Sequence, residues 1–327
     1  MLNLVIYLMI LVIGLHSYAQ SSLLQENQQI AQRSAQLLSL YDLETHQSWR
    51  DITAEVYQQS TTSDDVKQAI LEDQRRIVLF RYPSDGVQVK ALISFTPQAA
   101  HQPLIILLRG GNRHFGLLNP GSEWLACGDN VIVSSALRGG VSEGVDEFGG
   151  ADVNDIENMV NYLPVLAAQL HFNYSPSEIN MLGMSRGGLE MFLALSRSYQ
   201  LQKNVKKVVA LSAILDLQEQ IKQRPEDMEK MFIEDFGLVK GVNDVSWIAS
   251  RNPLNTVSSL PQNLAILIVQ GTDDPRVQPT EAHRMVNRLL QNQHTVTYWE
   301  IKEGQHLLTN RPTIKAEIFQ WLESHPC

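Results

Sequence analysis

Short apolar runs separated by helical patterns organise the sequence from residue 76 onward. Two of them, Arg76–Tyr82 and Val87–Phe95, flank the turn sequence Pro83–Gly86 and predict a β-hairpin. Wholly apolar runs follow at Leu104–Leu108, Val131–Ser134, Ile179–Leu182, Val208–Leu211 and Leu264–Val269. Because helical stretches separate these runs, they indicate a mostly parallel sheet that is buried on both faces and flanked by helices. A last strand, Thr295–Ile301, precedes an amphipathic closing helix, Thr313–Leu322.

Two stretches do not follow this alternation. Residues 20–75 carry apolar positions at near-helical spacing in a polar, glutamine-rich background, which predicts a helical segment packed on the main domain. Between about residues 216 and 260 the spacing is too long for one crossover, and residues 218–236 have a charged, helical pattern. We therefore expect a helical cap inserted into a main domain of residues 76–327.

The chain begins with an apolar run, Leu4–Leu15, that contains no charged residue. The run ends in Ser17, Tyr18 and Ala19, a small-x-small pattern suited to signal peptidase. It is shorter than the roughly 20 apolar residues that a membrane span needs, and no second stretch resembles a span. We expect residues 1–19 to be a cleaved signal peptide and the protein to be exported to a periplasm or the medium. An uncleaved anchor is the alternative.

Composition and charge exclude several classes of protein. Hydrophobic residues make up 44% and charged residues 19% of the 327, the balance of a globular protein with a sizeable core. The net charge is −9 and the basic residues are scattered, which disfavours nucleic acid as a partner. The sequence lacks the motifs of zinc peptidases, P-loop NTPases and dinucleotide-binding folds, so we expect no metal and no cofactor.

The two cysteines, Cys127 and Cys327, belong to no C-x-x-C pair, so neither a zinc ribbon nor a thioredoxin-like site is indicated. We expect a buried Cys127 and a free Cys327 at the chain terminus. A bridge between them in an oxidising compartment is the alternative.

A G-x-S-x-G sequence carries the strongest chemical signal. It runs from Gly183 to Gly187 with Ser185 at its centre, and it lies between a predicted strand and a helical run that starts at Leu189. A nucleophile elbow requires this strand–turn–helix setting, with small residues around a strained serine. The alternative is a glycine-rich turn with an incidental serine.

Two further residue types follow in the order that a hydrolase of this type requires, which is serine, acid and then histidine. Asp273 and Asp274 follow the apolar run that ends at Val269, and His306 follows the last predicted strand. We favour Asp274 as the acid, because Pro275 biases it toward an extended backbone and limits its freedom. Asp273 is expected to be a turn residue.

The loop after an earlier strand contains Arg109, Gly110 and Gly111. Small residues at this place let backbone N–H groups point at a developing oxyanion, and the amide of Arg186 would be the other donor. The alternative is a tight turn that merely needs glycine.

Three more segments make the pattern more specific. They are Ala136–Gly140, Gly149–Ile156 and Ser250–Leu254. Together with the candidate residues above, they resemble the catalytic domain of the prolyl oligopeptidase family from about Arg76 to the C-terminus. The resemblance implies an α/β-hydrolase fold with a Ser185, Asp274 and His306 triad. The family's Gly-x-x-Asp-x-x-Val pattern is matched by Gly271, Asp274 and Val277.

The sequence also departs from that family. Residues 21–75 are far too few for the β-propeller that usually precedes the catalytic domain, and no paired-glutamate motif is present to bind an N-terminal amine. Arg109 stands where the family often has a tyrosine that helps bind the oxyanion. The fold and the triad are therefore better supported than any peptidase specificity.

We expect a serine hydrolase that cleaves small esters or short peptides through an acyl-enzyme intermediate. The alternative is a non-catalytic binding protein that keeps the fold, and the oligomeric state stays open. The acidic loop with Glu143, Asp146 and Glu147 could bind a cationic group, but we expect a solvated surface. Trp247 could equally line a substrate pocket or pack in the core.

Overall fold

The computed structural model describes residues 29–97, 99, 102–239, 241 and 244–322. Contacts divide the chain into two compact units, one up to Asp42 and one from Leu43 onward. In the first unit, residues 29–39 are helical. The second unit contains the sheet and the candidate site.

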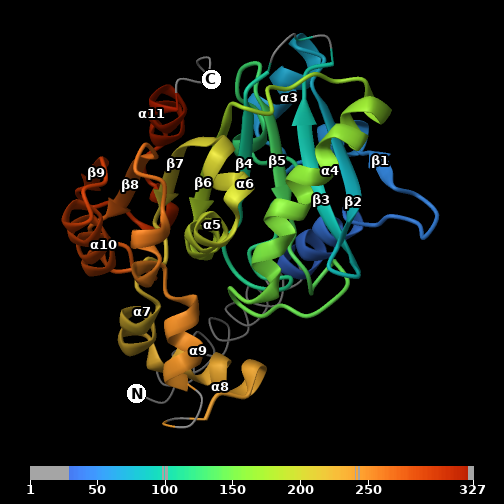
Figure 1. The fold of residues 1–327 in the computed structure, drawn as a ribbon. Helices are drawn as coiled ribbons and strands as arrows, with labels where there is room; N and C mark the ends of the chain where they lie inside the picture. The colour runs from blue at the N-terminus through green and yellow to red at the C-terminus, as the bar shows by residue number, and fades with distance from the viewer. Residues whose placement is uncertain (1–28, 98, 100–101, 240, 242–243, 323–327) are drawn as a thin grey trace, which may run out of the picture. The chain divides into compact units, whose positions relative to one another are not determined.

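Within the part of the chain that the structure describes, nine strands form one sheet in the order β1-β2-β3-β5-β4-β6-β7-β8-β9 (Figure 1). The strands are β1 (Trp49–Asp51), β2 (Arg76–Ser84), β3 (Val87–Phe95), β4 (Leu104–Leu108), β5 (Val131–Ser135), β6 (Ile179–Met184), β7 (Val205–Leu211), β8 (Ala265–Gly271) and β9 (Val296–Ile301). Neighbours from β1 through β3 to β5 pair antiparallel, and the remaining pairs are parallel. The predicted mostly parallel sheet is confirmed.

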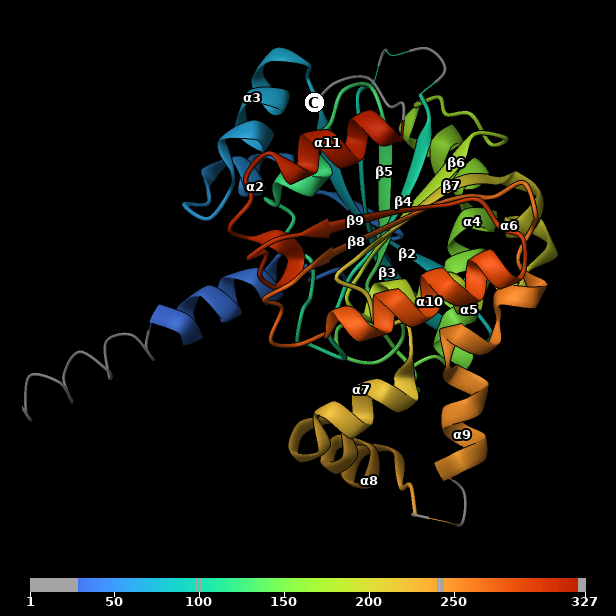
Figure 2. The same cartoon turned by 90° about the vertical axis from the view of Figure 1, so that its left-hand side faces the viewer.

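Helices cover both faces of the sheet. The labelled helices of this unit are α2 (Thr53–Gln58), α3 (Asp64–Glu72), α4 (Asn154–Leu170), α5 (Arg186–Arg197), α6 (Tyr199–Asn204), α7 (Leu217–Gln223), α8 (Lys230–Phe236), α9 (Asp244–Arg251), α10 (Pro279–Gln291) and α11 (Ile314–Trp321). Figure 2 shows α4, α5 and α10 on one side of the sheet and α3 with α11 on the other. Because both faces are covered, every residue of β4 and β5 is buried, which explains their wholly apolar pattern.

The N-terminal stretch contains a strand that the helical pattern did not predict. Residues Trp49–Asp51 form β1, which pairs antiparallel with Val78–Phe80 at the edge of the sheet. Three residues are too few to display the alternation that distinguishes a half-buried strand. The expected helices do occur beside it, as α2 and α3.

The cap consists of α7, α8 and α9, which lie together beyond one end of the sheet (Figure 1, Figure 2). The chain segments that enter and leave the cap are bonded to each other. Asp216 caps α7 and accepts a hydrogen bond of 2.9 Å from the side chain of Asn252. Arg284 of α10 lies 2.6 Å from the other oxygen of Asp216. The two ends of the cap are therefore tied to each other and to α10.

Glu281 of α10 also bonds the backbone where the chain enters the cap. One of its carboxyl oxygens accepts hydrogen bonds of 3.1 Å from the N–H groups of both Leu215 and Asp216, and the side chain is fully buried. Burial raises the pKa of Glu281 to about 8; the two N–H groups oppose that rise, and the carboxylate of Asp216 adds to it. Glu281 is accordingly protonated at neutral pH in the folded protein.

Replacing Glu281 by glutamine should flatten the pH dependence of stability. The carboxyl group keeps its proton up to about pH 8 when folded but loses it near 4.5 when unfolded, so the wild-type free energy of unfolding falls as pH rises between these values. Glutamine keeps the acceptor and has no proton to lose. Urea unfolding at pH 5, 7 and 9 should give similar stabilities at pH 5 and a variant more stable by at least about 1.4 kcal/mol at pH 9. Parallel pH profiles for the two proteins would contradict this account.

Two expectations concern residues outside the described part. The expected signal peptide, residues 1–19, and Cys327 both lie there. Cys127 is described, and it is buried and disulfide-bonded, so our preference for unbridged cysteines is wrong. No helix of the described residues has the length and apolar character that crossing a membrane requires.

Candidate active site

Ser185 lies at a sharp turn between β6 and α5. Its backbone has φ 53° and ψ −121°, a conformation that is strained for any residue with a side chain. The glycines beside it are needed for space. A Cβ on Gly187 would lie 2.1 Å from the carbonyl oxygen of Leu108, and a Cβ on Gly183 would lie 2.6 Å from that of Gly187. The G-x-S-x-G sequence therefore forms the strand–turn–helix elbow that its context predicted.

His306 and Asp274 are hydrogen-bonded to each other. The Nδ1 atom of His306 lies 2.8 and 3.0 Å from the two carboxyl oxygens of Asp274. Asp274 also accepts from the backbone N–H groups of Arg276, at 2.8 Å, and Val277, at 3.0 Å. Asp273, by contrast, is exposed and bonds the hydroxyl of Thr272. The structure thus brings Asp274, and not its neighbour, to His306.

The surroundings of Asp274 keep it ionised. Burial alone would raise the pKa of its carboxyl group. The hydrogen bond and charge of His306, with the N–H groups of Val277 and Arg276, outweigh burial and lower that pKa below its ordinary value. A carboxylate with this environment can hold the imidazole in one tautomer, with Nε2 directed away from it.

The loop that carries His306 is fixed at its base. The N–H of Leu307 donates to the hydroxyl of Ser212, at 3.0 Å, and Leu307 has φ 56°. Gly304 and Gly271 touch so closely that a Cβ on Gly271 would lie 2.1 Å from the oxygen of Gly304. These contacts hold the end of β9 against the end of β8, which carries Asp274.

Ser185 and His306 line the same cavity, of about 370 Å³. The other lining residues are Arg109, Gly110, Gly111, Phe115, Gly116, Leu117, Leu118, Asn119, Ser122, Trp124, Met184, Arg276 and Leu307. None of these described residues is acidic, and none comes from the cap. The cap therefore contributes no residue to the lining of this cavity. Trp247 packs against Phe232 and Phe236 inside the cap.

Gly110 lies directly beside the serine, since a Cβ there would be 2.9 Å from the Cβ of Ser185. Arg186 is the first residue of α5, where backbone N–H groups lack partners within the helix. The sequence named Arg109 with Gly110 and Gly111 as candidates for the oxyanion-binding loop and left the direction of the Arg109 side chain open. The guanidinium of Arg109 donates to backbone carbonyls of the loop and of the chain after β5, and so ties these segments together. The acceptors belong to Gly110, Arg113, Phe115 and Ala136.

A buried ionic cluster surrounds the side chain of Arg186 and was missed by sequence reasoning. Its carboxylates belong to Asp146, Asp152 and Glu190. We expected Asp146 on a solvated surface, which is wrong, because this carboxylate is buried against the guanidinium of Arg186. The Gly149–Ile156 motif, which supplies Asp152, was the signal that could have pointed to the cluster.

The pKa values of two acids in the cluster are shifted in opposite directions. Burial would raise the pKa of Asp146, but the charge and hydrogen bonds of Arg186 lower it below its ordinary value. Burial, with the carboxylate of Asp152 nearby, raises the pKa of Glu190 well above its ordinary range. Asp146 makes the bidentate contact of the cluster, with one oxygen 2.8 Å from Nη1 and the other 2.8 Å from Nη2 of Arg186.

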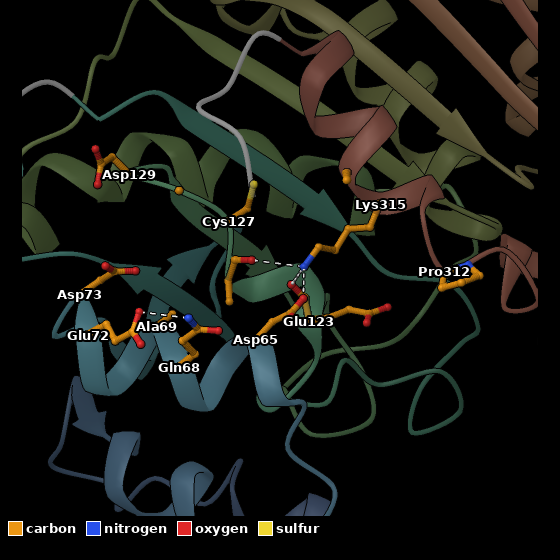
Figure 3. A pocket seen from close by; sticks show the side chains of 13 residues that line it. Asp65, Gln68, Ala69, Glu72, Asp73, Glu123, Cys127, Asp129, Pro312 and Lys315 are labelled. Carbon is orange, nitrogen blue, oxygen red and sulfur yellow. Dashed lines mark hydrogen bonds and ion pairs between the residues drawn. The ribbon is translucent and has the colours of Figure 1, made fainter.

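A larger cavity, of about 710 Å³, lies between α3 and α11 (Figure 3). Its acidic residues are Asp65, Glu72, Asp73, Glu123 and Asp129. Asp65 forms an ion pair with Lys315, whose Nζ lies 2.5 Å from its carboxylate. Its lining contains neither serine nor histidine, and among the described residues no cluster could hold a metal ion. The smaller cavity at Ser185 is therefore the candidate active site.

Comparisons with known proteins give matches to peptidases. The model of the prolyl oligopeptidase family matches residues 141–325. The uncharacterized peptidase YtmA of Bacillus subtilis (strain 168) is 23% identical over 255 residues, which cover 76% of this chain and 94% of YtmA. Dipeptidyl peptidase family member 6 of Caenorhabditis elegans is 26% identical over 228 residues, which cover 65% of this chain but 29% of that protein.

Solved structures show the same fold. The Pyrococcus horikoshii acylaminoacyl peptidase superposes with a TM-score of 0.60 at 17% identity, covering 75% of this chain and 40% of that one. A puromycin-hydrolyzing peptidase of Mycobacterium tuberculosis gives 0.59 at 18% identity, covering 77% and 40%. The chain thus spans about two fifths of these larger proteins, and its described residues contain no β-propeller.

The fold, the strained serine turn and the family match point the same way. The family model covers more than half of the sequence, and the solved structures share the α/β-hydrolase fold. This chain belongs to the prolyl oligopeptidase family of serine hydrolases.

Proposed function

We propose that the chain cleaves short peptides or small esters, with Ser185 as nucleophile, His306 as general base and Asp274 as the acid that orients it. One observation carries the proposal: the serine at the elbow and the histidine bonded to Asp274 line the same cavity. A serine hydroxyl is a weak nucleophile until a neighbouring base accepts its proton.

The reaction follows from this arrangement. The Oγ atom of Ser185 attacks the substrate carbonyl carbon as its proton passes to Nε2 of His306. The oxyanion that forms accepts hydrogen bonds from the backbone N–H of Arg186 and from the Gly110–Gly111 segment. The bond to the leaving alcohol or amine then breaks, and His306 returns the proton to that group. Water, activated by His306, releases the acyl group from Ser185 in the second half.

The cavity favours small substrates without a positive charge. Its volume of about 370 Å³ suits a small molecule or a few residues of peptide. Phe115, Leu117, Leu118 and Trp124 supply an apolar wall, and no acidic side chain among the described lining residues could pair with a free N-terminal amine. We therefore expect substrates with a blocked or absent amine to be preferred over free aminoacyl compounds.

A substrate panel tests this expectation. We would compare p-nitrophenyl acyl esters with p-nitroanilides of single amino acids, each anilide with a free and an acetylated amine. Esters and acetylated anilides should be cleaved with the higher kcat/KM, because the cavity offers no counter-charge for an ammonium group. Preference for free-amine anilides, or for casein over all of these small compounds, would overturn the proposed specificity.

A further inference from the structure

The side chain of Arg186 connects two parts of the candidate site that are distant in the sequence. Arg186 follows the nucleophile directly, yet its guanidinium reaches the loop after β4. Its Nη1 atom donates to the carbonyl oxygen of Gly111, at 3.2 Å, and to Asp146, at 2.8 Å. Its Nη2 atom donates to the second oxygen of Asp146, also at 2.8 Å. The pair is bidentate, which fixes its direction as well as its distance.

Asp146 continues the link to the same loop. The oxygen that faces Nη1 of Arg186 also accepts from the backbone N–H of Arg113, at 3.0 Å. The loop is therefore held at Gly111 by the arginine and at Arg113 by the aspartate. Gly111 has φ 69°, and a Cβ there would lie 2.1 Å from the oxygen of Phe115, so this loop has little room to shift.

The backbone of this loop and the backbone of Arg186 are the two segments proposed above to stabilise the oxyanion. Oxyanion donors act only when they lie at hydrogen-bond distance from the place where the charge develops. The separation between the two segments is therefore a quantity that catalysis depends on. Arg186 supplies a donor on its own backbone segment and, through its side chain, holds the loop at Gly111.

Stability alone is a weak explanation for the cluster. Arg186 is 1% exposed, and removing an ion pair from water costs roughly what its attraction returns, so such pairs often contribute little net stability. A buried bidentate pair does restrict geometry strongly, and this one restricts the segments that flank the nucleophile.

We propose that Arg186 and Asp146 are positioning residues that set the separation of the two oxyanion-binding backbone segments. The inference rests on the proposed function. It predicts a loss that appears in kcat and in the binding of tetrahedral transition-state mimics, while KM changes little, because the two side chains do not touch the substrate.

The test compares Arg186→Lys and Arg186→Met with a matched control, Arg138→Met. Arg138 is also buried and pairs with a buried aspartate, its Nη2 lying 2.7 Å from Asp155, but its side chain bonds neither oxyanion segment. Kinetics on a p-nitrophenyl ester and the inhibition constant of an alkyl boronic acid would be measured for each protein. Circular dichroism and urea unfolding would establish that each variant is folded.

We expect both Arg186 variants to lose about 10²-fold in kcat, the order seen when one oxyanion donor is removed, with KM within threefold. Boronic acid binding should weaken in parallel. Arg186→Lys should lose as much kcat as Arg186→Met, because the ammonium group of lysine cannot make the two parallel hydrogen bonds that a guanidinium makes to a carboxylate. Arg138→Met should lower stability but keep kcat within threefold. If neither Arg186 variant folds, Asp146→Asn, which keeps the side-chain shape, is expected to show the same kcat loss.

Two outcomes overturn the inference while leaving the proposed function intact. One is an Arg186 or Asp146 variant that folds and keeps kcat within threefold of wild type. The other is an equal kcat loss in Arg138→Met, which would mean that any disturbed buried pair has this effect. A wild-type protein that neither hydrolyses esters nor reacts with fluorophosphonates refutes the proposed function instead, and the inference with it.

Discussion

Replacing Ser185 by alanine is expected to lower kcat by about 10⁶-fold, the loss seen when a serine protease loses its nucleophile. The hydroxyl of Ser185 is the group proposed to form the acyl-enzyme, and the side chain of alanine contains no nucleophile. The remaining site could still bind substrate and polarise its carbonyl, so KM should change little. Steady-state kinetics on the best ester of the panel would measure this.

Ser196→Ala is the matched control for that experiment. Ser196 lies on the same helix, α5, but its hydroxyl donates to the backbone oxygen of Leu193 and it does not line the cavity. Its replacement should leave kcat within about twofold. Activity in Ser185→Ala above about 1% of wild type would contradict the assigned nucleophile.

The second large effect is expected at Asp274. Changing it to asparagine should lower kcat by about 10⁴-fold, as the equivalent change does in serine proteases, because the amide cannot hold His306 in the required tautomer or stabilise its charged form. Asp273→Asn should cost tenfold or less, about 1.4 kcal/mol of positioning. Asp273 is the matched control, being adjacent, exposed and bonded to Thr272 alone among the described side chains.

Both variants would be measured on the same ester at the same pH. A larger loss at Asp273 would mean that the loop after β8 is arranged differently in solution. Equal small losses would mean that no carboxylate orients His306, and the triad proposal would then fail.

Much of the sheet could be predicted from the sequence, because a strand buried on both faces must be apolar throughout. The run at residues 104–108 coincides with β4, and Val87–Phe95 coincides with β3. The ends of the strands were harder to predict from the sequence. β7 begins at Val205 rather than Val208, since Lys206 and Lys207 lie at its start, where a strand emerges from the core and charged residues are tolerated.

The candidate site was predictable where a motif forces local geometry. The glycines around Ser185 are needed by close contacts to the strand and helix beside it, so the sequence alone located the turn. Asp274 and His306 followed from their places after β8 and β9. Their contact depends on the sheet bringing two loops together, which no local pattern contains.

The burial of the ionic cluster could not be predicted from its charges alone, because charge in a sequence does not reveal burial. Asp146 and Arg186 are 40 positions apart, and each by itself resembles a surface residue. The side chain of Arg109 could not be placed for a similar reason: the sequence shows its position beside the glycines, whereas the backbone carbonyls of Gly110, Arg113, Phe115 and Ala136 decide where its guanidinium lies.

The most direct test of the central claim is to find the atom that reacts. The purified protein would be treated with a fluorophosphonate, digested, and analysed by mass spectrometry, beside Ser185→Ala as control. The account predicts one stoichiometric adduct on Ser185 and none in the variant. An adduct on a different residue, labelling that survives in Ser185→Ala, or no labelling of the folded wild-type protein would contradict it.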